Sequence, residues 1–401
     1  MDTNKAPKLS QNIKRITILG ATGSVGESVL SVINSQPERF KVHAVVAKKS
    51  AEKLAKIAIE QKAKLAVLFE EAQLPVLRTA LAGSGIECAA GSLAIQQAAA
   101  EDVDLVVAAI VGAAGIRPTW AALSAGNQIA LANKECLVSA GKLFTKEAER
   151  QGLPILPVDS EHNAIWQVFE SEQRASIEAV TLTASGGPFR TWSAEDIAKA
   201  TPAQALNHPN WSMGSKVTID SASLMNKGLE LIEAKYLFGL NADQLRVVVH
   251  PQSIIHGFVH YSDGSVLAQL GCADMRIPVA CCLNWPDRGP SPGDKLDLAK
   301  MSSLTFEEAD MKRFPCLQLA FDAMAGGAIL TNALNAANEI AVSSFLSGKI
   351  GFASIAQIVA KVLDDVSAAN STQVFETIDD AIQCDLNARE RALHYVVNTA
   401  L

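Results

Sequence analysis

The chain has 401 residues, a formal net charge of −7 and a hydrophobic fraction of 49%. This length predicts two or three domains with a large core. The acidic balance argues against a nucleic-acid partner, and aromatic residues, at 5%, provide few stacking surfaces for bases. No apolar run reaches the roughly 20 residues that cross a membrane. The seven cysteines form no Cys-x-x-Cys pair and residues 1–12 lack a secretory signal, so we expect a cytoplasmic protein.

From Lys14 to Asp159, short β-branched runs alternate with Ala-rich helical segments. This alternation is typical of a parallel sheet covered on both faces, so the predicted fold class is α/β with a Rossmann-like doubly wound sheet. We expect strands near residues 15–19, 41–47, 64–69, 86–89, 104–110, 128–132 and 154–158. We expect helices over residues 24–35, 51–61, 71–82, 92–100, 116–125 and 138–151.

After Asp159 the pattern changes to that of a central α+β domain. We expect, in order, a helix at 163–172, a strand at 176–184, a polar loop at 206–219, one long helix at 221–238, a strand at 246–251, a hairpin at 255–270 and a helix at 275–285. Prolines and glycines predict a surface linker over 286–315, and the remainder has the pattern of a C-terminal α-helical bundle. The predicted domains are therefore 1–159, 160–285 and 316–401, with the linker at 286–315.

The first candidate site is the glycine-rich segment Gly20–Gly26, which follows an apolar strand and opens a helix. Glycines at such a turn let a pyrophosphate approach the backbone at the start of the helix. After the second strand the chain has Lys48, Lys49 and Ser50 in place of the acidic residue usual for NAD, which favours NADP. A glycine-rich turn without a ligand and two solvated lysines remain the alternatives.

The second candidate site begins at Pro157-Val158-Asp159-Ser160-Glu161-His162. In an extended backbone Asp159 and Glu161 would face the same side, which is the outline of a divalent-cation site. Farther along, Asn226, Lys227 and Glu230 share one face of a predicted helix, and Glu230 would complete an all-oxygen site that suits Mg²⁺ or Mn²⁺. The alternatives are an acidic loop that caps a strand and an exposed Lys-Glu pair.

Three further segments carry polar groups in places that suit substrate binding. Lys134 follows an apolar strand and either binds an anionic or hydroxyl-bearing substrate or pairs with Glu135 or another neighbouring carboxylate. The turn Ser185-Gly186-Gly187 can direct a hydroxyl and backbone amides toward an anion. The 206–219 loop has the composition of a lid, with a loop that docks on the core as the alternative. For His250 and His256, around Pro251-Gln252-Ser253, a structural and a functional role are equally compatible with the sequence.

Taken together, these motifs closely resemble the 1-deoxy-D-xylulose 5-phosphate reductoisomerase family, in the family's order and over nearly the whole chain. The resemblance rests on the glycine loop, Ala132-Asn133-Lys134-Glu135, Val158–His162, Ala184–Phe189, His208–Gly214, Met225–Glu230, His250–Ser253 and Asp274-Met275-Arg276. It implies a homodimeric enzyme of non-mevalonate isoprenoid biosynthesis. Such an enzyme converts 1-deoxy-D-xylulose 5-phosphate to 2-C-methyl-D-erythritol 4-phosphate with NADPH and a divalent cation.

The resemblance also implies roles for individual residues. Asp159, Glu161 and Glu230 would hold the cation, and these three with Lys134 are the implied catalytic residues. The implied substrate contacts are Lys134, Ser160, Glu161, Ser185, His208, Ser221, Asn226, Lys227 and Glu230, with Trp211 to Met213 as a closing flap. The implied NADPH contacts are Thr22, Gly23, Ser24, Val25, Lys48, Lys49, Ser50, Asn133, Glu135 and Gly214.

The chain departs from the family pattern in two places. It has Lys48-Lys49-Ser50 where many members have Gly-Lys-Asn, and Ala273 where many have proline. The first departure leaves Lys49 for a 2′-phosphate but puts the contacts of Lys48 and Ser50 in doubt, and the second is expected to loosen a nearby loop. Two other functions compete with the resemblance: a simple NADP-dependent sugar-phosphate reductase without rearrangement, and a nucleotide-sensing protein without turnover.

Overall fold

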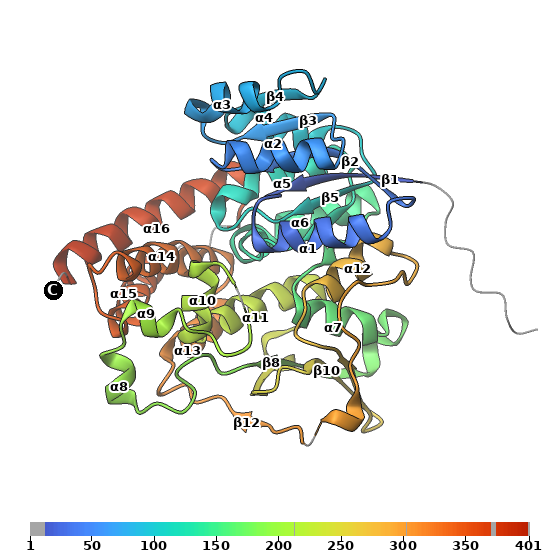
Figure 1. Cartoon of the computed structure of the whole chain (residues 1–401). Coiled ribbons are helices and arrows are strands. Elements are labelled where there is room, and N and C mark those ends of the chain that lie inside the picture. Colours follow the sequence, from blue (N-terminus) through green and yellow to red (C-terminus); the bar gives the residue numbers. More distant parts are fainter. Residues whose placement is uncertain (1–12, 212, 302, 370–373, 400–401) are drawn as a thin grey trace, which may run out of the picture. The chain divides into compact units, whose positions relative to one another are not determined.

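The computed structural model describes residues 13–211, 213–301, 303–369 and 374–399 (Figure 1). Residues 1–12, where the sequence predicts no secretory signal, and Ser212 of the predicted flap lie outside the described residues. The chain forms two compact units, each described by itself below. The first comprises the chain up to Asn133, Glu147–Asn163 and Asp274–Asp294; the second comprises Lys134–Lys146, Ala164–Ala273 and the chain from Lys295 onward. The finer domain boundaries drawn from the sequence stay a prediction.

The first unit is built on a seven-stranded parallel sheet in the order β4-β3-β2-β1-β5-β6-β7. Its strands are β1 (Lys14–Leu19), β2 (Phe40–Ala47), β3 (Leu65–Leu68), β4 (Glu87–Ala90), β5 (Leu105–Ala108), β6 (Ile129–Leu131) and β7 (Leu156–Pro157). The strand order reverses between β1 and β5, and in such sheets ligands bind at the carboxyl ends of the strands at this point. The predicted doubly wound sheet is confirmed.

Helices lie on both sides of this sheet (Figure 1). They are α1 (Ser24–Ser35), α2 (Ala51–Glu60), α3 (Leu74–Ala80), α4 (Ser92–Ala100), α5 (Ile116–Ser124) and α12 (Arg276–Asn284), with short 3-10 turns η1 (Glu71–Gln73) and η2 (Ala113–Gly115). Two helices continue along the chain from one unit into the other: α6 (Glu135–Gln151) and α7 (Ser160–Val168). Because both faces are covered, Ile16, Ile18 and Leu19 of β1 are completely buried.

The second unit contains a five-stranded mixed sheet in the order β11-β10-β8-β9-β12. Its strands are β8 (Ile177–Ala184), β9 (Leu245–Val249), β10 (Ile255–Tyr261), β11 (Val266–Leu270) and β12 (Glu307–Glu308). Strands β10 and β11 form the predicted antiparallel hairpin, whereas β8 and β9 run parallel with Ala184 opposite Val249. The carboxyl ends of β8 and β9 therefore lie side by side.

The helices of the second unit include the predicted C-terminal helical segment. They are α8 (Ala194–Ala198), α9 (Pro202–Ala205), α10 (Ser215–Ala222), α11 (Met225–Leu237), α13 (Pro315–Gly326), α14 (Ala328–Leu346), α15 (Ala353–Ala368) and α16 (Ile378–Thr399), with 3-10 turns η3 (Ser171–Ser176), η4 (Ala242–Gln244) and η5 (Leu298–Lys300). One continuous core joins these helices to the sheet region, as where the rings of Phe189 and Phe352 meet edge to face at 5.1 Å.

Three local predictions are wrong. The single helix at 221–238 is two helices, α10 and α11, because Leu224 adopts a left-handed backbone conformation with φ of 57°. The helix expected at 163–172 is α7 from Ser160 to Val168, followed by η3. The segment predicted as a linker also contributes strand β12, which pairs with β9.

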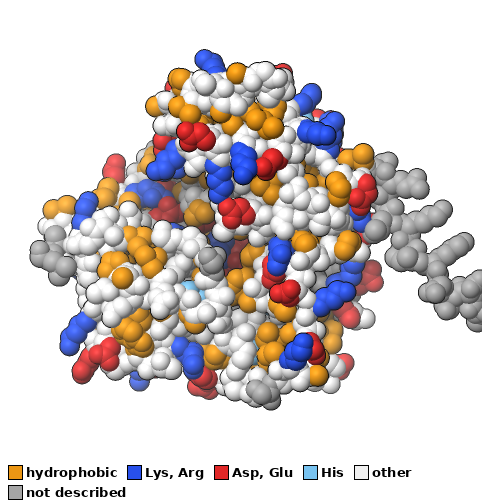
Figure 2. Space-filling view, in the orientation of Figure 1, with side chains coloured by type: hydrophobic (Ala, Val, Ile, Leu, Met, Phe, Trp, Pro, Cys, Tyr) orange, Lys and Arg blue, Asp and Glu red, His pale blue; other side chains and the backbone are white. Residues whose placement is uncertain are grey.

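Within the described residues, no helix is long and apolar enough to span a bilayer. On the face shown in Figure 2, lysines and arginines are interspersed with acidic side chains. This mixed distribution agrees with the net charge of −7 and provides no extended basic surface there for a phosphate backbone.

Candidate active site

The glycine loop connects β1 to α1 at the point where the strand order of the first sheet reverses. A side chain at Gly20, where φ is +93°, would meet the carbonyl oxygen of Ala109 at 2.5 Å, and one at Gly26 would meet the carbonyl oxygen of Gly20 at 2.5 Å. These two glycines permit the tight turn itself. Gly23 is exposed and precedes the first residue of α1, so backbone N–H groups of the helix start are open to an anion.

The other predicted cofactor residues of the first unit lie after two further strands of the same sheet, β2 and β6. Lys48, Lys49 and Ser50 are exposed and follow β2, which pairs directly with β1. Asn133 follows β6 and is buried; its amide donates to the carbonyl oxygen of Gly112, at 2.9 Å, and to that of Ile110. Asn133 thus holds the loop after β5 in place beside the glycine loop.

Asp159 and Glu161 do not lie on a strand, which corrects the argument from an extended backbone. Strand β7 ends at Pro157, and Asp159 is the N-cap of α7: its carbonyl oxygen accepts from Asn163 N–H at 2.9 Å, and its side chain from Glu161 N–H at 3.2 Å. Carboxylate oxygens of Asp159 and Glu161 still come within 4.8 Å of each other. The reason is a helical first turn and not strand alternation.

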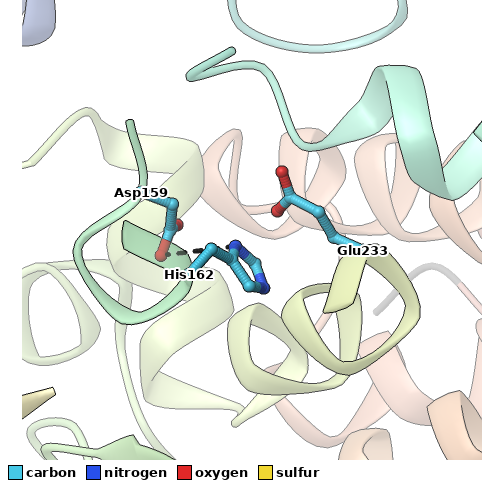
Figure 3. Close-up of side chains that lie close together, drawn as sticks. All are labelled: Asp159, His162 and Glu233. Carbon is cyan, nitrogen blue, oxygen red and sulfur yellow. Dashed lines mark ion pairs between the residues drawn. The ribbon is translucent and has the colours of Figure 1, made fainter. Parts of the chain in front are cut away.

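Neighbouring side chains orient these two carboxylates. Figure 3 shows Asp159 and His162 on the same turn of chain; Oδ1 and Nδ1 lie 3.7 Å apart, and the ring of His162 is completely buried. The Ser160 hydroxyl donates to the Glu161 carboxylate. Two half-buried carboxylates so close repel each other unless a cation or a proton lies between them, so this turn suits a divalent cation.

In the second unit, the predicted residues Lys134, Asn226, Lys227 and Glu230 come together around one carboxylate. The Lys134 ammonium lies 3.0 Å from Glu230 Oε1 and 2.8 Å from Asn226 Oδ1. Lys227 pairs with the other oxygen, Glu230 Oε2, and Asn226 also donates to Oε1. Glu230 is only 1% exposed, so the two ammonium groups balance a charge that burial would otherwise disfavour.

A second group of predicted residues, Ser185, His208 and Ser221, also assembles within this unit. Ser185 follows β8, Ser221 lies on α10, and His208 lies in the loop between α9 and α10. The Nε2 atom of His208 is 3.0 Å from Ser185 Oγ and 3.1 Å from Ser221 Oγ. Burial lowers the pKa of His208, so a neutral imidazole faces two hydroxyl groups.

The structure adds one residue that the sequence argument did not single out, Lys216 on α10. Its side chain is 17% exposed, and its ammonium lies 2.8 Å from Glu135 and 2.9 Å from Asp220. Burial acts to raise the pKa of Glu135, but the charge of Lys216 and its hydrogen bond outweigh burial and leave that pKa below its ordinary value. The spacing of four between Lys216 and Asp220 was the available sequence signal.

The remaining candidates occupy distinct positions in the second unit. Gly214 is exposed and is the N-cap of α10. His250 is completely buried, with Nδ1 2.9 Å from the carbonyl oxygen of Thr305. His256 is buried on β10, 6.2 Å from the ring of Trp211. Of the predicted flap, Trp211 and Met213 are described and half-buried.

Comparison with known proteins identifies the family. Family profiles for 1-deoxy-D-xylulose 5-phosphate reductoisomerase match residues 16–141, for its C-terminal domain residues 155–238, and for the DXP reductoisomerase C-terminal domain residues 270–391. Proteins of that name are 51% identical in Bradyrhizobium sp. (strain ORS 278), over 97% of this chain and 95% of the relative, and 52% identical in Rhodopseudomonas palustris (strain BisA53), over 96% and 94%. The chain belongs to the 1-deoxy-D-xylulose 5-phosphate reductoisomerase family.

Solved structures of the family have the same fold. A DOX-P reductoisomerase in complex with NADPH, fosmidomycin and magnesium superposes with a TM-score of 0.93 at 42% identity, covering 96% of this chain and 98% of the other. The Zymomonas mobilis reductoisomerase in complex with NADPH has a TM-score of 0.89 at 44% identity, covering 96% and 99%. The resemblance drawn from the motifs is therefore confirmed, and the simple reductase and the nucleotide sensor are set aside.

Proposed function

We propose that this reductoisomerase converts 1-deoxy-D-xylulose 5-phosphate to 2-C-methyl-D-erythritol 4-phosphate in non-mevalonate isoprenoid biosynthesis, with NADPH as reductant and Mg²⁺ or Mn²⁺ as cation. The family match along nearly the whole chain carries this proposal. Retroaldol cleavage and aldol re-joining rearrange the carbon chain, and hydride transfer from NADPH reduces the resulting aldehyde.

The cofactor residues are those that suit the two ends of NADPH. Thr22 and Gly23 immediately precede α1, and Ser24 and Val25 begin it, where backbone N–H groups bind pyrophosphate. Lys48, Lys49 and Ser50 take the 2′-phosphate after β2, the strand next to β1. Asn133, Glu135 and Gly214 complete the set. Support comes from the exposed Gly23 and the exposed lysines, which fit a ligand that carries several negative charges.

Asp159, Glu161 and Glu230 hold the divalent cation. The three ligands are all carboxylates, which suits Mg²⁺ or Mn²⁺, and the closeness of Asp159 to Glu161 favours a cation there. When bound, the cation polarises oxygens of the substrate and stabilises the negative charge that develops on them. Lys134 donates to Glu230 and Asn226 and places its ammonium group beside the substrate oxygens that the cation polarises.

The remaining polar residues bind the substrate. Ser160 contacts the hydroxyl-bearing end, while Ser185, Ser221, Asn226 and Lys227 bind the phosphate, with His208 between the two serines. Trp211 and Met213 close over the site and exclude water, so that binding energy from the phosphate orients the reacting carbons. We further propose that the enzyme is a homodimer and works in the cytoplasm.

The experiment follows NADPH oxidation by absorbance in metal-stripped protein supplied with 1-deoxy-D-xylulose 5-phosphate. Oxidation is expected only after Mg²⁺ or Mn²⁺ is added, and carbon NMR of the product should show a branched chain. Absence of metal-dependent oxidation would overturn the proposed function. An unbranched product would instead favour a simple reductase.

The variant Glu230→Gln tests the metal assignment. We expect turnover to fall by about 10³-fold or more, because one ligand charge is lost, while the Kd for NADPH stays nearly unchanged. Glu195→Gln, at an exposed carboxylate in the first turn of α8, is the matched control and should retain activity. Loss of NADPH binding together with turnover in Glu230→Gln would contradict the assignment.

A further inference from the structure

The segment His250–Ser253, which the proposed function does not use, follows the carboxyl end of β9 in the second sheet. Strands β8 and β9 are parallel, and their last residues, Ala184 and Val249, lie opposite each other. Ser185 and His250, which follow them, therefore lie at the same end of the strand pair. The His250 N–H donates to the carbonyl oxygen of Ala184 at 2.7 Å. The segment is therefore fixed at the same end of the β8-β9 pair as Ser185.

A second set of contacts holds the segment from the other side. The buried ring of His250 donates from Nδ1 to the carbonyl oxygen of Thr305 at 2.9 Å and stacks on Phe306 with ring centroids 4.8 Å apart. Gln252 Nε2 donates to Thr305 Oγ1 at 2.8 Å. Ser253 is 6% exposed and has a positive φ of 50°. Because contacts with Ala184 and with Thr305 and Phe306 fix its position, the segment can hold a side chain that binds to it in place.

Asn210, in the loop that carries His208, binds to this segment. Its side-chain amide donates one hydrogen to the carbonyl oxygen of Pro251 at 2.7 Å and one to Ser253 Oγ at 3.0 Å. An asparagine amide has two hydrogens, so both are used. Asn210 thereby ties the loop between α9 and α10 to the segment that follows β9.

The same loop also orients the imidazole of His208. Backbone N–H groups of Asn210 and Trp211 donate to His208 Nδ1 at 3.1 and 3.0 Å. Because Nδ1 accepts twice, the ring hydrogen of the neutral imidazole is on Nε2, the atom that faces the hydroxyl groups of Ser185 and Ser221.

We propose that Asn210 is a positioning residue that ties the His208 loop to Pro251 and Ser253, and so directs His208 Nε2 at the Ser185 and Ser221 hydroxyls. Asn210 therefore acts through His208. Without the hydrogen bonds of Asn210, the binding-competent conformation of the loop is less populated, and the substrate, which needs that conformation, binds more weakly. The kinetic part of this proposal rests on the proposed function.

Hydrogen exchange tests the tie without any turnover. In the full-length protein, Asn210→Ala removes both side-chain hydrogen bonds, so the Trp211 amide, corrected for its intrinsic rate, should exchange about tenfold faster. Asn207→Ala, at an exposed asparagine of the same loop, should leave the rate unchanged. An unchanged rate in Asn210→Ala would overturn the proposal.

Steady-state kinetics test what the tie does. Asn210→Ala should raise KM for 1-deoxy-D-xylulose 5-phosphate about tenfold while KM for NADPH and the midpoint of thermal unfolding stay as in the parent protein. Faster exchange with an unchanged sugar-phosphate KM would overturn the positioning role, as would an equal rise of both KM values. If the parent protein itself shows no turnover, the proposed function fails and the exchange experiment still decides the tie.

The acceptor side provides an independent check. Ser253→Ala removes one of the two acceptors and should raise the sugar-phosphate KM less than Asn210→Ala does. In the double variant, Ser253→Ala should add little to the effect of Asn210→Ala, because the shared contact is already lost. Fully additive effects would show that the two side chains act separately and would overturn the proposed contact.

Discussion

At the scale of single residues, the protonation of His208 follows from its four neighbours. Two backbone N–H groups donate to Nδ1, and Nε2 faces two hydroxyl groups. A proton on Nδ1 would point at two donors and break both contacts. Burial disfavours the charged ring and lowers the pKa of His208 from its ordinary 6.5.

We therefore predict that His208 titrates below pH 6.5 and carries its hydrogen on Nε2. The unfolded chain binds this proton more readily than the folded protein, so the contribution of His208 to stability is present above pH 6.5 and is lost as the pH falls through the lower folded pKa. Nitrogen NMR of labelled protein measures both the tautomer and the pKa, with His208→Gln to assign the signal. A pKa above 6.5 or a hydrogen on Nδ1 would contradict this assignment.

Residue types and spacing predicted much of the candidate site. Asn226, Lys227 and Glu230 lie on one helical face because spacings of three and four do so in any helix. The closeness of Asp159 and Glu161 was predicted from strand alternation, although a helical first turn produces it. The contacts of Lys216 with Glu135 and of Asn210 with Ser253 could not be predicted, because both join distant segments.

At the scale of elements, a glycine turn brings β8 against α10. A side chain at Gly187 would meet the carbonyl oxygen of Ser221 at 2.7 Å, so the turn after Ser185 touches the backbone of α10 directly. Any side chain there would push Ser221 away from Ser185. The two hydroxyls that face His208 therefore depend on the absence of a side chain at Gly187.

We predict that Gly187→Ala raises KM for the sugar phosphate about tenfold or more and lowers the unfolding midpoint, because the added Cβ separates the two serines. Gly239→Ala is the matched control: Gly239 has φ of 61°, close to the 64° of Gly187, but nothing lies within 4 Å of its added Cβ. Both variants carry similar backbone strain, about 1–2 kcal/mol. The difference between them, from kinetics and thermal unfolding, isolates the contact with Ser221; equal KM values would argue against it.

Helix and strand positions were predicted well where the hydrophobic period was regular, and poorly where one residue broke the element. Alternating runs in the first 159 residues predicted the parallel sheet. By contrast, the break between α10 and α11 lies at Leu224, and leucine is a good helix former with no preference for a left-handed backbone. Packing in the buried core imposes that conformation, and sequence patterns do not record it.

At the scale of the whole chain, the C-terminal helices share their core with the segment around the second sheet. A side chain at Gly228 on α11 would meet Ala320 Cβ on α13 at 2.4 Å, which shows how closely these helices pack. On α14, the buried Asn332 donates to the carbonyl oxygen of Ser139 at 3.1 Å, and Asn338 donates to Asp220 at 2.8 Å. Composition predicted a separate helical domain after a proline-rich linker, but composition does not record which faces are buried.

The fragment 316–401 tests whether these helices fold alone. Separated from the rest, they would expose the face of Phe352 that packs on Phe189 and leave buried amides such as that of Asn338 without their partners. Each large apolar side chain loses about 1.5–3 kcal/mol on full exposure, against a net stability of about 5–15 kcal/mol for a domain. We therefore expect the fragment to show little protection in hydrogen exchange and no cooperative thermal transition by circular dichroism. The full-length chain, as control, should show both. A cooperative transition in the fragment would mean that the predicted boundary at 316 does mark an independent domain. The core of helices α13 to α16 would then be sufficient for folding, and the contacts of α14 with Ser139 and Asp220 would only add to it.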